Sequence, residues 1–152
     1  ILGTNASYRS SDYIADLVAL LYYEKGVEVW GDDYDIVLGG GHLKLRSPYS
    51  LSNGKISYGD VYSILPFDNQ IVLCSIKGKY LKSRFLNTNN GDYHIYKSPS
   101  LTKIDDNKTY YIITDTWTST YKYNNLTEIA RLDASTYARD LLADYIKDGG
   151  LE

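Results

Sequence analysis

Residues 56–81 read ISYGDVYSILPFDNQIVLCSIKGKYL, and this stretch predicts a helix, a strand and a second helix in close succession. We expect residues 58–65 to form the first helix, which ends at Pro66 because proline has no backbone N–H and cannot continue an α-helix. Residues 70–76 are apolar and predict a buried strand. A glycine then turns the chain into a helix from about residue 79 to residue 86. Helices and strands that alternate in this irregular way favour an α+β fold.

An amphipathic helix is expected on the N-terminal side of this stretch. Ser10 offers a capping oxygen, and apolar residues follow at helical spacing, namely Ile14, Leu17, Val18, Leu21 and Tyr22. We expect Gly26 to end this helix. Residues 27–30 alternate between apolar and charged or aromatic side chains and predict a short strand.

A second buried strand is predicted over residues 35–38. It runs straight into three glycines, which we expect to form a loop: Gly39, Gly40 and Gly41. Glycine-rich loops let backbone N–H groups approach an anionic ligand closely, and they also serve as plain structural turns. The spacing of these glycines matches neither the dinucleotide-binding fingerprint nor the phosphate-binding P-loop. A structural turn is therefore the favoured interpretation of the glycines taken alone.

The C-terminal half adds further elements of both kinds. Residues 87–108 are polar and predict a loop with one short strand over 93–96. Residues 109–114 are β-branched and aromatic and predict a strand. A last helix is expected from Asp133, as its cap, to the glycines at 149–150. We therefore predict a single domain over residues 1–152, with a mixed β-sheet packed against helices.

Composition excludes several classes of protein. The chain has 152 residues, of which 43% are hydrophobic and 23% charged, as in ordinary globular domains. No apolar run reaches the ~20 residues that a membrane-spanning helix needs. The net charge of −3 and the scattered basic residues are unlike those of a protein that binds a nucleic-acid backbone. Cys74 is the single cysteine, so a disulfide within the chain is excluded. Because the chain begins at Ile1 and contains no Met, we expect it to be one domain of a longer protein.

A few side chains are candidates for binding a ligand. Lys44 and Arg46 follow the glycines and can hold a carboxylate, a phosphate or a ribose, or can simply be solvated. Phe67 follows Pro66, where an apolar ring normally joins the core. Trp117 follows a predicted strand, where we expect a loop, and can stack on a base or sugar, or can pack at the rim of the core. His42 and His94 lack the spacing of a metal motif, so we expect them at the surface or in hydrogen bonds. No complete catalytic set of residues is present.

The order of these motifs resembles that of the C-terminal domain of the 5′-nucleotidase family, which includes UDP-sugar hydrolases and 2′,3′-cyclic-nucleotide phosphodiesterases. The resemblance spans residues 8–147 and is carried mainly by the glycines and by five short segments, which are 54–57 (GKIS), 60–61 (DV), 65–69 (LPFDN), 76–81 (IKGKYL) and the capped first helix. The segment Pro66-Phe67-x-Asn69 is the most specific part.

The resemblance implies that this chain binds substrate and that catalysis takes place elsewhere. In that family a separate N-terminal metallophosphoesterase domain holds two divalent metal ions, and its ligand motifs are absent here. The implied partners are therefore that domain of the same parent chain and a nucleoside or nucleotide, with no cofactor in this chain itself. The resemblance also implies an extracellular, cell-surface or periplasmic location.

The family's binding residues transfer to this sequence only in part. By resemblance, Phe67 and Trp117 are the two rings that sandwich the base, and Asn69 belongs to the same substrate site. The resemblance also implies that the polar end of the ligand is held by the glycine loop together with a basic residue, namely Gly39, Gly40 and Gly41 with Lys44 or Arg46. The glycine segment aligns in two ways, which place either Lys44 or Leu43 where the family has an arginine, and Arg46 can substitute from two positions further on. Residues 118–125 read TSTYKYNN in place of the family's Gly-Gly-Asp-Gly segment.

Two other functions remain open at this stage. The chain can be a non-catalytic binding module that keeps the fold and has lost the nucleotide site, or a Tyr-rich surface or carbohydrate-binding domain. The placement of the two rings separates these hypotheses, because a base sandwich requires parallel rings about 7 Å apart, twice the ~3.5 Å contact distance between carbon atoms.

Overall fold

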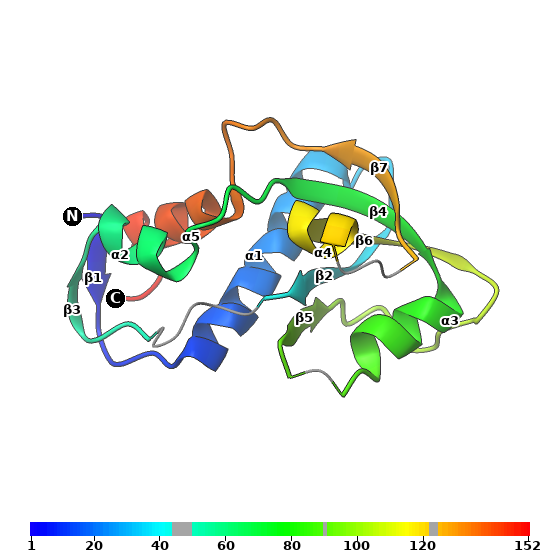
Figure 1. Cartoon of the computed structure of the whole chain (residues 1–152), viewed down its shortest axis with the longest axis horizontal. Coiled ribbons are helices and arrows are strands. Elements are labelled where there is room, and N and C mark those ends of the chain that lie inside the picture. Colours follow the sequence, from blue (N-terminus) through cyan, green and yellow to red (C-terminus); the bar gives the residue numbers. More distant parts are fainter. Residues whose placement is uncertain (44–49, 90, 122–124) are drawn as a thin grey trace.

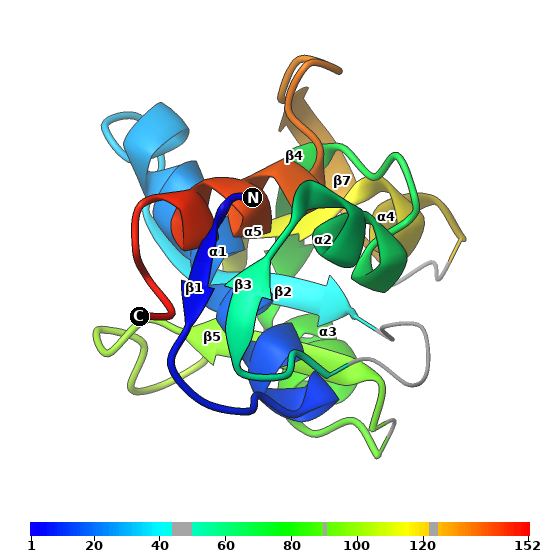
Figure 2. The same cartoon turned by 90° about the vertical axis from the view of Figure 1, so that its left-hand side faces the viewer.

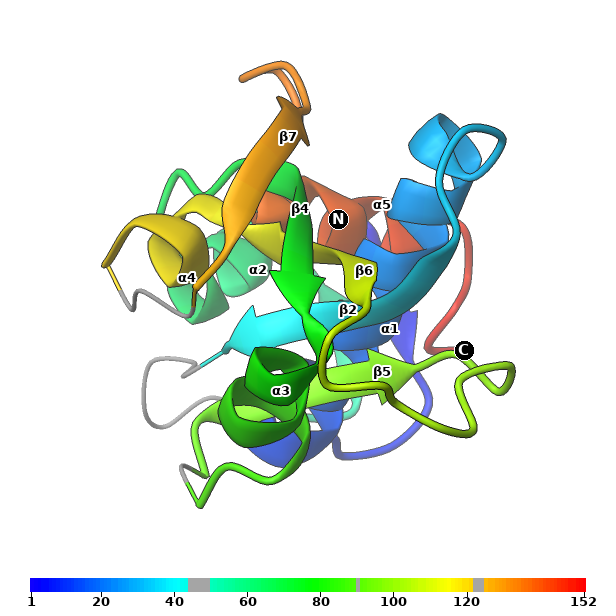
Figure 3. The same cartoon turned by 90° about the vertical axis from the view of Figure 1, so that its right-hand side faces the viewer.

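A five-stranded sheet forms the centre of the computed structural model, which describes residues 1–43, 50–89, 91–121 and 125–152. Its strands lie in the order β5 (Tyr93–Lys97), β2 (Ile36–His42), β6 (Thr109–Asp115), β4 (Ile71–Lys77) and β7 (Thr127–Arg131). The pair β2 and β6 is parallel and the other neighbours are antiparallel (Figure 3). The sheet is therefore mixed, and the predicted α+β class is confirmed.

Helices cover both faces of this sheet. The long helix α1 (Ser11–Trp30) packs on one face, and α2 (Tyr58–Ile64) and α5 (Ala138–Lys147) join the same apolar cluster at its end next to a second, smaller sheet (Figure 1). The short helix α3 (Gly78–Leu81) and a π-helical turn, η1 (Lys82–Leu86), pack on the other face. A small two-stranded sheet of β1 (Gly3–Asn5) and β3 (Gly54–Ile56) lies to one side of the helices (Figure 2).

Side chains of β4 alternate between the two layers, as a strand buried on both faces requires. Ile71 and Leu73 join the cluster beneath α1, whereas Val72, Cys74 and Ile76 join the cluster beneath α3. All five side chains are at most 2% exposed. This double burial explains why residues 70–76 read as a continuous apolar run, and it confirms the predicted strand.

Helix α1 extends further than expected. Gly26 does not end it, and residues 27–30 belong to the helix instead of a strand. A Cβ atom at Gly26 would overlap the side chain of Ile113 in the sheet, so this glycine allows close packing of helix on sheet. The helix ends at Gly31, whose N–H donates to the carbonyl of Val27.

The expected glycine loop is wrong, because Gly39, Gly40 and Gly41 lie inside strand β2. A Cβ at Gly39 would stand 2.8 Å from the carbonyl oxygen of Ala19 in α1. Gly40 and Gly41 have φ angles of 132° and 155°, which side chains rarely adopt. These glycines therefore bring β2 close to the neighbouring backbone.

The last helix begins later than predicted. Its N-cap is Tyr137, whose N–H donates to the side chain of Asp140 over 2.7 Å. Asp133 instead closes a preceding turn, where its carboxylate accepts from the N–H of Ser135 over 2.7 Å. A short helix, α4 (Thr116–Tyr121), follows β6 directly, so Trp117 lies on a helix and not on a loop.

Candidate functional site

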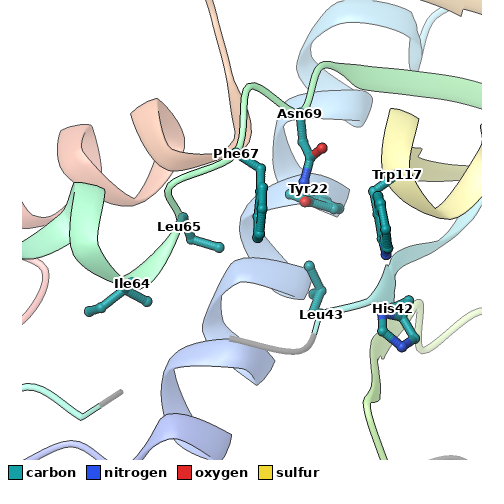
Figure 4. A pocket seen from close by; sticks show the side chains of 8 residues that line it. All are labelled: Tyr22, His42, Leu43, Ile64, Leu65, Phe67, Asn69 and Trp117. Atoms are coloured by element: carbon teal, nitrogen blue, oxygen red, sulfur yellow. The ribbon is translucent and has the colours of Figure 1, made fainter. Parts of the chain in front are cut away.

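Two aromatic rings face each other at one end of the sheet. The rings of Phe67 and Trp117 have centroids 6.4 Å apart and planes inclined by 14° (Figure 4). Phe67 is 49% exposed and Trp117 is 39% exposed, so neither ring belongs to the core. Nearly parallel, half-exposed rings at this separation form an open clamp for a flat ligand.

Strand pairing places the two rings opposite each other. Strands β4 and β6 are antiparallel neighbours with Ile71 opposite Asp115. One residue beyond this pair, the N–H of Thr116 donates to the carbonyl of Gln70 over 3.0 Å, and the N–H of Gln70 donates to Thr116 Oγ1 over 3.2 Å. Phe67 precedes Gln70 by three residues and Trp117 follows Thr116. Both rings are therefore held at the same end of adjacent strands.

A cavity of about 170 Å³ lies at the clamp. Its lining is largely apolar and comprises Tyr22, His42, Leu43, Ile64, Leu65, Phe67, Asn69 and Trp117. In Figure 4 the side chain of Asn69 extends toward the gap between the two rings, and Tyr22 lines the same cavity. Cavities that enclose a whole small-molecule ligand usually measure about 300–1,000 Å³. This one suits a single flat ring system whose substituents extend outside.

A buried hydrogen bond supports the Trp117 side of the clamp. The hydroxyl of Tyr22, on α1, donates to Asp115 Oδ2 over 2.7 Å, and both residues are fully buried. Asp115 Oδ1 accepts from the N–H of Thr118 over 2.8 Å, which places this carboxylate at the start of α4. Asp115 thereby connects two helices: α4, which carries Trp117, and the long helix α1.

Burial dominates the electrostatics of this pair. Desolvation raises the pKa of Asp115 above its ordinary value of 3.8, although hydrogen bonds from Thr118 and Tyr22 oppose that rise. Desolvation also raises the pKa of Tyr22 well above 10, and the neighbouring Asp115 adds to the shift. Tyr22 therefore remains a hydrogen-bond donor at neutral pH.

His42 lies beside Trp117 at the end of β2. Its backbone N–H donates to Thr118 Oγ1 over 3.0 Å, and its ring Nε2 lies 3.6 Å from Asp92 Oδ2. The ring of Tyr93 meets it edge-on, with centroids 5.5 Å apart. His94 forms a hydrogen bond from Nδ1 to Asp16 Oδ1 over 2.8 Å. Both histidines are thus engaged in contacts, as the sequence suggested.

The structure gathers only part of the predicted site. Phe67, Trp117 and Asn69 line one cavity, whereas Gly39, Gly40 and Gly41 are buried within β2 and do not line it. Lys44 and Arg46 lie outside the described residues. The substrate-binding roles assigned to all these residues remain predictions.

Sequence reasoning missed several of the lining residues. Tyr22 looks like any other member of the apolar stripe on α1, and Ile64 and Leu65 look like ordinary core residues at a helix end. His42 and Leu43 directly follow the three glycines, and that position was the available signal for them.

The part of the chain that the structure describes contains neither a metal-binding cluster nor a membrane-spanning helix. Among those residues, no three His, Cys, Asp or Glu side chains are grouped so that they could hold a metal ion. None of the described helices combines the length and apolar character needed to cross a membrane.

Comparison with known proteins gives one family match and several structural matches. The sequence model described as "5′-nucleotidase, C-terminal domain" matches residues 12–101. The curated proteins give no match. A 5′-nucleotidase precursor from Thermus thermophilus superposes with a TM-score of 0.64 at 16% identity, over 97% of this chain and 36% of that one. The NAD nucleotidase of Haemophilus influenzae superposes with a TM-score of 0.56 at 12% identity, over 97% of this chain and 34% of that one. The chain thus spans about a third of the length of these proteins.

Proposed function

The chain belongs to the family of 5′-nucleotidase C-terminal domains, and from this premise we propose that it recognises a nucleoside or nucleotide for a larger phosphohydrolase. In this proposal, catalysis belongs to an N-terminal metallophosphoesterase domain of the same parent chain, which holds two divalent metal ions. The reaction is hydrolysis of a phosphomonoester, a cyclic phosphodiester or a nucleotide-sugar pyrophosphate. An extracellular, cell-surface or periplasmic location is part of the same proposal.

The observation that carries the proposal is the facing pair of Phe67 and Trp117. A flat base between two rings needs about 7 Å, twice the ~3.5 Å contact distance between carbon atoms. The observed 6.4 Å therefore needs to widen by only about half an ångström. Base–aromatic stacking contributes about 1–3 kcal/mol per base. The amide of Asn69 can offer both a donor and an acceptor to a polar ligand atom.

The residues proposed to bind the phosphate or ribose of the ligand come from the family resemblance. Lys44 or Arg46, which follow the three glycines in the sequence, are the basic residues proposed to hold a phosphate or a ribose beyond the cavity. A lysine replaces an arginine only in part, because it lacks the planar fork that binds two phosphate oxygens at once. We therefore expect the base to contribute more to the affinity than the phosphate.

A second candidate function is a binding module that has kept the fold and lost the nucleotide site. The buried glycines favour it, because their close contacts within the sheet account for them without a ligand. Leu43 also favours it, since this apolar side chain lines the cavity near the position of the family's arginine. Such a module would bind a flat ligand weakly or not at all.

A fluorescence titration separates the two functions. The Trp30→Phe protein keeps Trp117 as its one tryptophan, and it is titrated with adenosine, AMP and UMP. We expect saturable quenching that is weakened by a further Phe67→Leu change and unaffected by Tyr8→Leu, a substitution at an exposed ring outside the cavity. The absence of any response up to millimolar ligand, in a protein whose circular dichroism shows it folded, would contradict the proposal and favour the second candidate.

A further inference from the structure

Arg139 lies in the first turn of α5, and its guanidinium lies against helix α2 and the segment that carries Phe67. Its side chain is 9% exposed. Nη1 donates to the carbonyl oxygen of Phe67 over 2.9 Å, Nη2 donates to Asp68 Oδ1 over 2.7 Å, and Nε donates to the hydroxyl of Tyr58 over 3.2 Å. All three nitrogens of the guanidinium are therefore engaged, and two of them hold consecutive residues of the segment that carries the Phe67 ring.

Aromatic rings fix the guanidinium in place. Its central carbon lies 4.8 Å from the ring centre of Tyr62 and 4.8 Å from that of Tyr137. Cation–π contacts of this kind favour a cation within about 6 Å of a ring centre. The hydroxyl of Tyr58 in turn donates to Asp140 Oδ1 over 3.1 Å. Helix α2, helix α5 and the Phe67 segment thus meet at one side chain.

Backbone hydrogen bonds hold the segment that carries the Phe67 ring. The ring is half exposed, so burial in the core does not fix its position. The chain around it lies between helix α2 and strand β4 and is irregular. One further bond ties the end of this segment to α5, from the N–H of Ala138 to the carbonyl of Asn69 over 2.8 Å. At Phe67 itself the carbonyl is held by Arg139.

We propose that Arg139 is a positioning residue that holds the Phe67 ring opposite Trp117. It need not touch a ligand; it fixes the backbone from which the first ring of the clamp projects. A lysine cannot reproduce this arrangement, because its single ammonium lacks the planar fork that reaches a carbonyl and a carboxylate together. The effect of Arg139 on ligand affinity rests on the proposed function, whereas its effect on the order of residues 67–69 does not.

The first test measures backbone mobility without ligand. Nitrogen-15 relaxation is compared in the wild type, in Arg139→Lys and in Arg84→Lys, a matched change at an exposed arginine of η1. We expect the order parameters of the Phe67, Asp68 and Asn69 amides to fall from about 0.85 towards 0.6 in Arg139→Lys alone, while that of Trp117 is retained. Unchanged order parameters at residues 67–69 would overturn the proposal.

A milder variant covers the case in which Arg139→Lys does not fold. Asp68→Ala removes one partner of the guanidinium at an exposed position and leaves the bond to the Phe67 carbonyl. It is expected to give a smaller fall in the same three order parameters. An Asp68→Ala protein with fully ordered residues 67–69, together with an unchanged or unfolded Arg139→Lys, would contradict the proposal.

The second test measures adenosine affinity by calorimetry. Arg139→Lys is expected to weaken binding about tenfold, which corresponds to the loss of one hydrogen bond to a charged group, and Arg84→Lys is expected to leave it unchanged. If the wild type fails to bind adenosine, the proposed function fails, and the mobility measurement still decides the role of Arg139. If the wild type binds and Arg139→Lys binds equally well, the positioning role is wrong.

Discussion

The hydroxyl of Tyr22 and the carboxylate of Asp115 are sealed from solvent and bonded to each other over 2.7 Å. Burying a polar group is unfavourable unless its hydrogen bonds are satisfied, so each residue stabilises the other. Asp115 also accepts from the N–H of Thr118 at the start of α4. At the scale of single residues, this pair fixes the short helix that bears Trp117, just as Arg139 supports the segment that bears Phe67.

Replacing Tyr22 with phenylalanine removes one donor from the buried carboxylate. We expect the free energy of unfolding to fall by about 1–3 kcal/mol, the usual effect of leaving a buried group without a partner. Urea unfolding measures it. The control is Tyr8→Phe at an exposed ring, for which the change should stay within about 0.5 kcal/mol. Equal stability of the two variants would show that the bond to Asp115 contributes nothing.

Asp115 also predicts a pH dependence of stability. Because burial raises its folded-state pKa above the ordinary 3.8, the folded protein binds this proton more tightly than the unfolded chain does. Its contribution is fully present below pH 3.8 and is lost as the pH rises through the folded-state pKa. The stability of the wild type relative to Asp115→Asn should therefore decrease as the pH rises from about 4. A difference that grows with pH over this range would contradict the raised pKa.

At the scale of elements, the contact between α1 and β2 is closer than side chains permit. Gly39 lies against the backbone of α1, where an added Cβ would stand 2.8 Å from the carbonyl oxygen of Ala19. Gly59, in the first turn of α2, has only Ser57 Oγ near its Cβ direction, at 3.5 Å. The two positions therefore test packing and helix propensity separately.

Gly39→Ala is expected to lower the free energy of unfolding by about 1–3 kcal/mol or more, because the backbones of α1 and β2 must separate. Gly59→Ala should be neutral or stabilising by up to about 1 kcal/mol, since alanine favours a helix over glycine. Thermal and urea unfolding of both variants measure these changes. A Gly39→Ala protein as stable as the wild type would show that α1 can move away without loss.

The elements that the sequence predicts well are those whose own pattern decides them. Strand β4 is an apolar run buried on both faces, and α2 is bounded by the cap Ser57 and by Pro66. The extension of α1 could not be predicted in this way. Glycine at position 26 has the usual character of a helix end, and only its contact with Ile113 in the folded sheet makes it part of the helix interior.

The two rings of the site could be predicted from the sequence, but the helix that carries Trp117 could not. Phe67 and Trp117 followed from a resemblance to a family, and the structure places them face to face. Helix α4 was missed because its threonines favour a helix weakly. Its first turn is instead capped by Asp115, a buried residue whose partner Tyr22 comes from 93 residues earlier in the chain. Such long-range contacts leave no local pattern in the sequence.

At the scale of the whole molecule, two apolar clusters lie on opposite faces of one sheet, and Cys74 belongs to the cluster beneath α3. Its side chain is 0% exposed. Burial raises the pKa of its thiol from 9.0 to about 12, and the charges of Glu128 and Asp115 add to the shift. Since the thiolate is the reactive form, this cysteine is doubly protected in the folded state.

Labelling of Cys74 should therefore report unfolding of the sheet. At pH 8 we expect a thiol reagent to react with it only as often as the core opens, with a rate that follows the free energy of unfolding as urea is added. In a Ser83→Cys variant, the new thiol at an exposed position of η1 should react at once and Cys74 slowly. Prompt reaction of both thiols without denaturant would contradict a rigid, closed sheet.

Proton NMR of adenosine shows whether Phe67 and Trp117 enclose a flat base. Protons held over aromatic faces shift upfield, so the base protons at C2 and C8 should move upfield as protein is added. Phe67→Leu and Trp117→Leu should each reduce the shift and weaken binding by about 1–3 kcal/mol, whereas Tyr8→Leu should change neither. Base protons that do not shift with millimolar adenosine and folded wild-type protein, or that shift as far with both ring variants as with the wild type, would contradict a base held between Phe67 and Trp117.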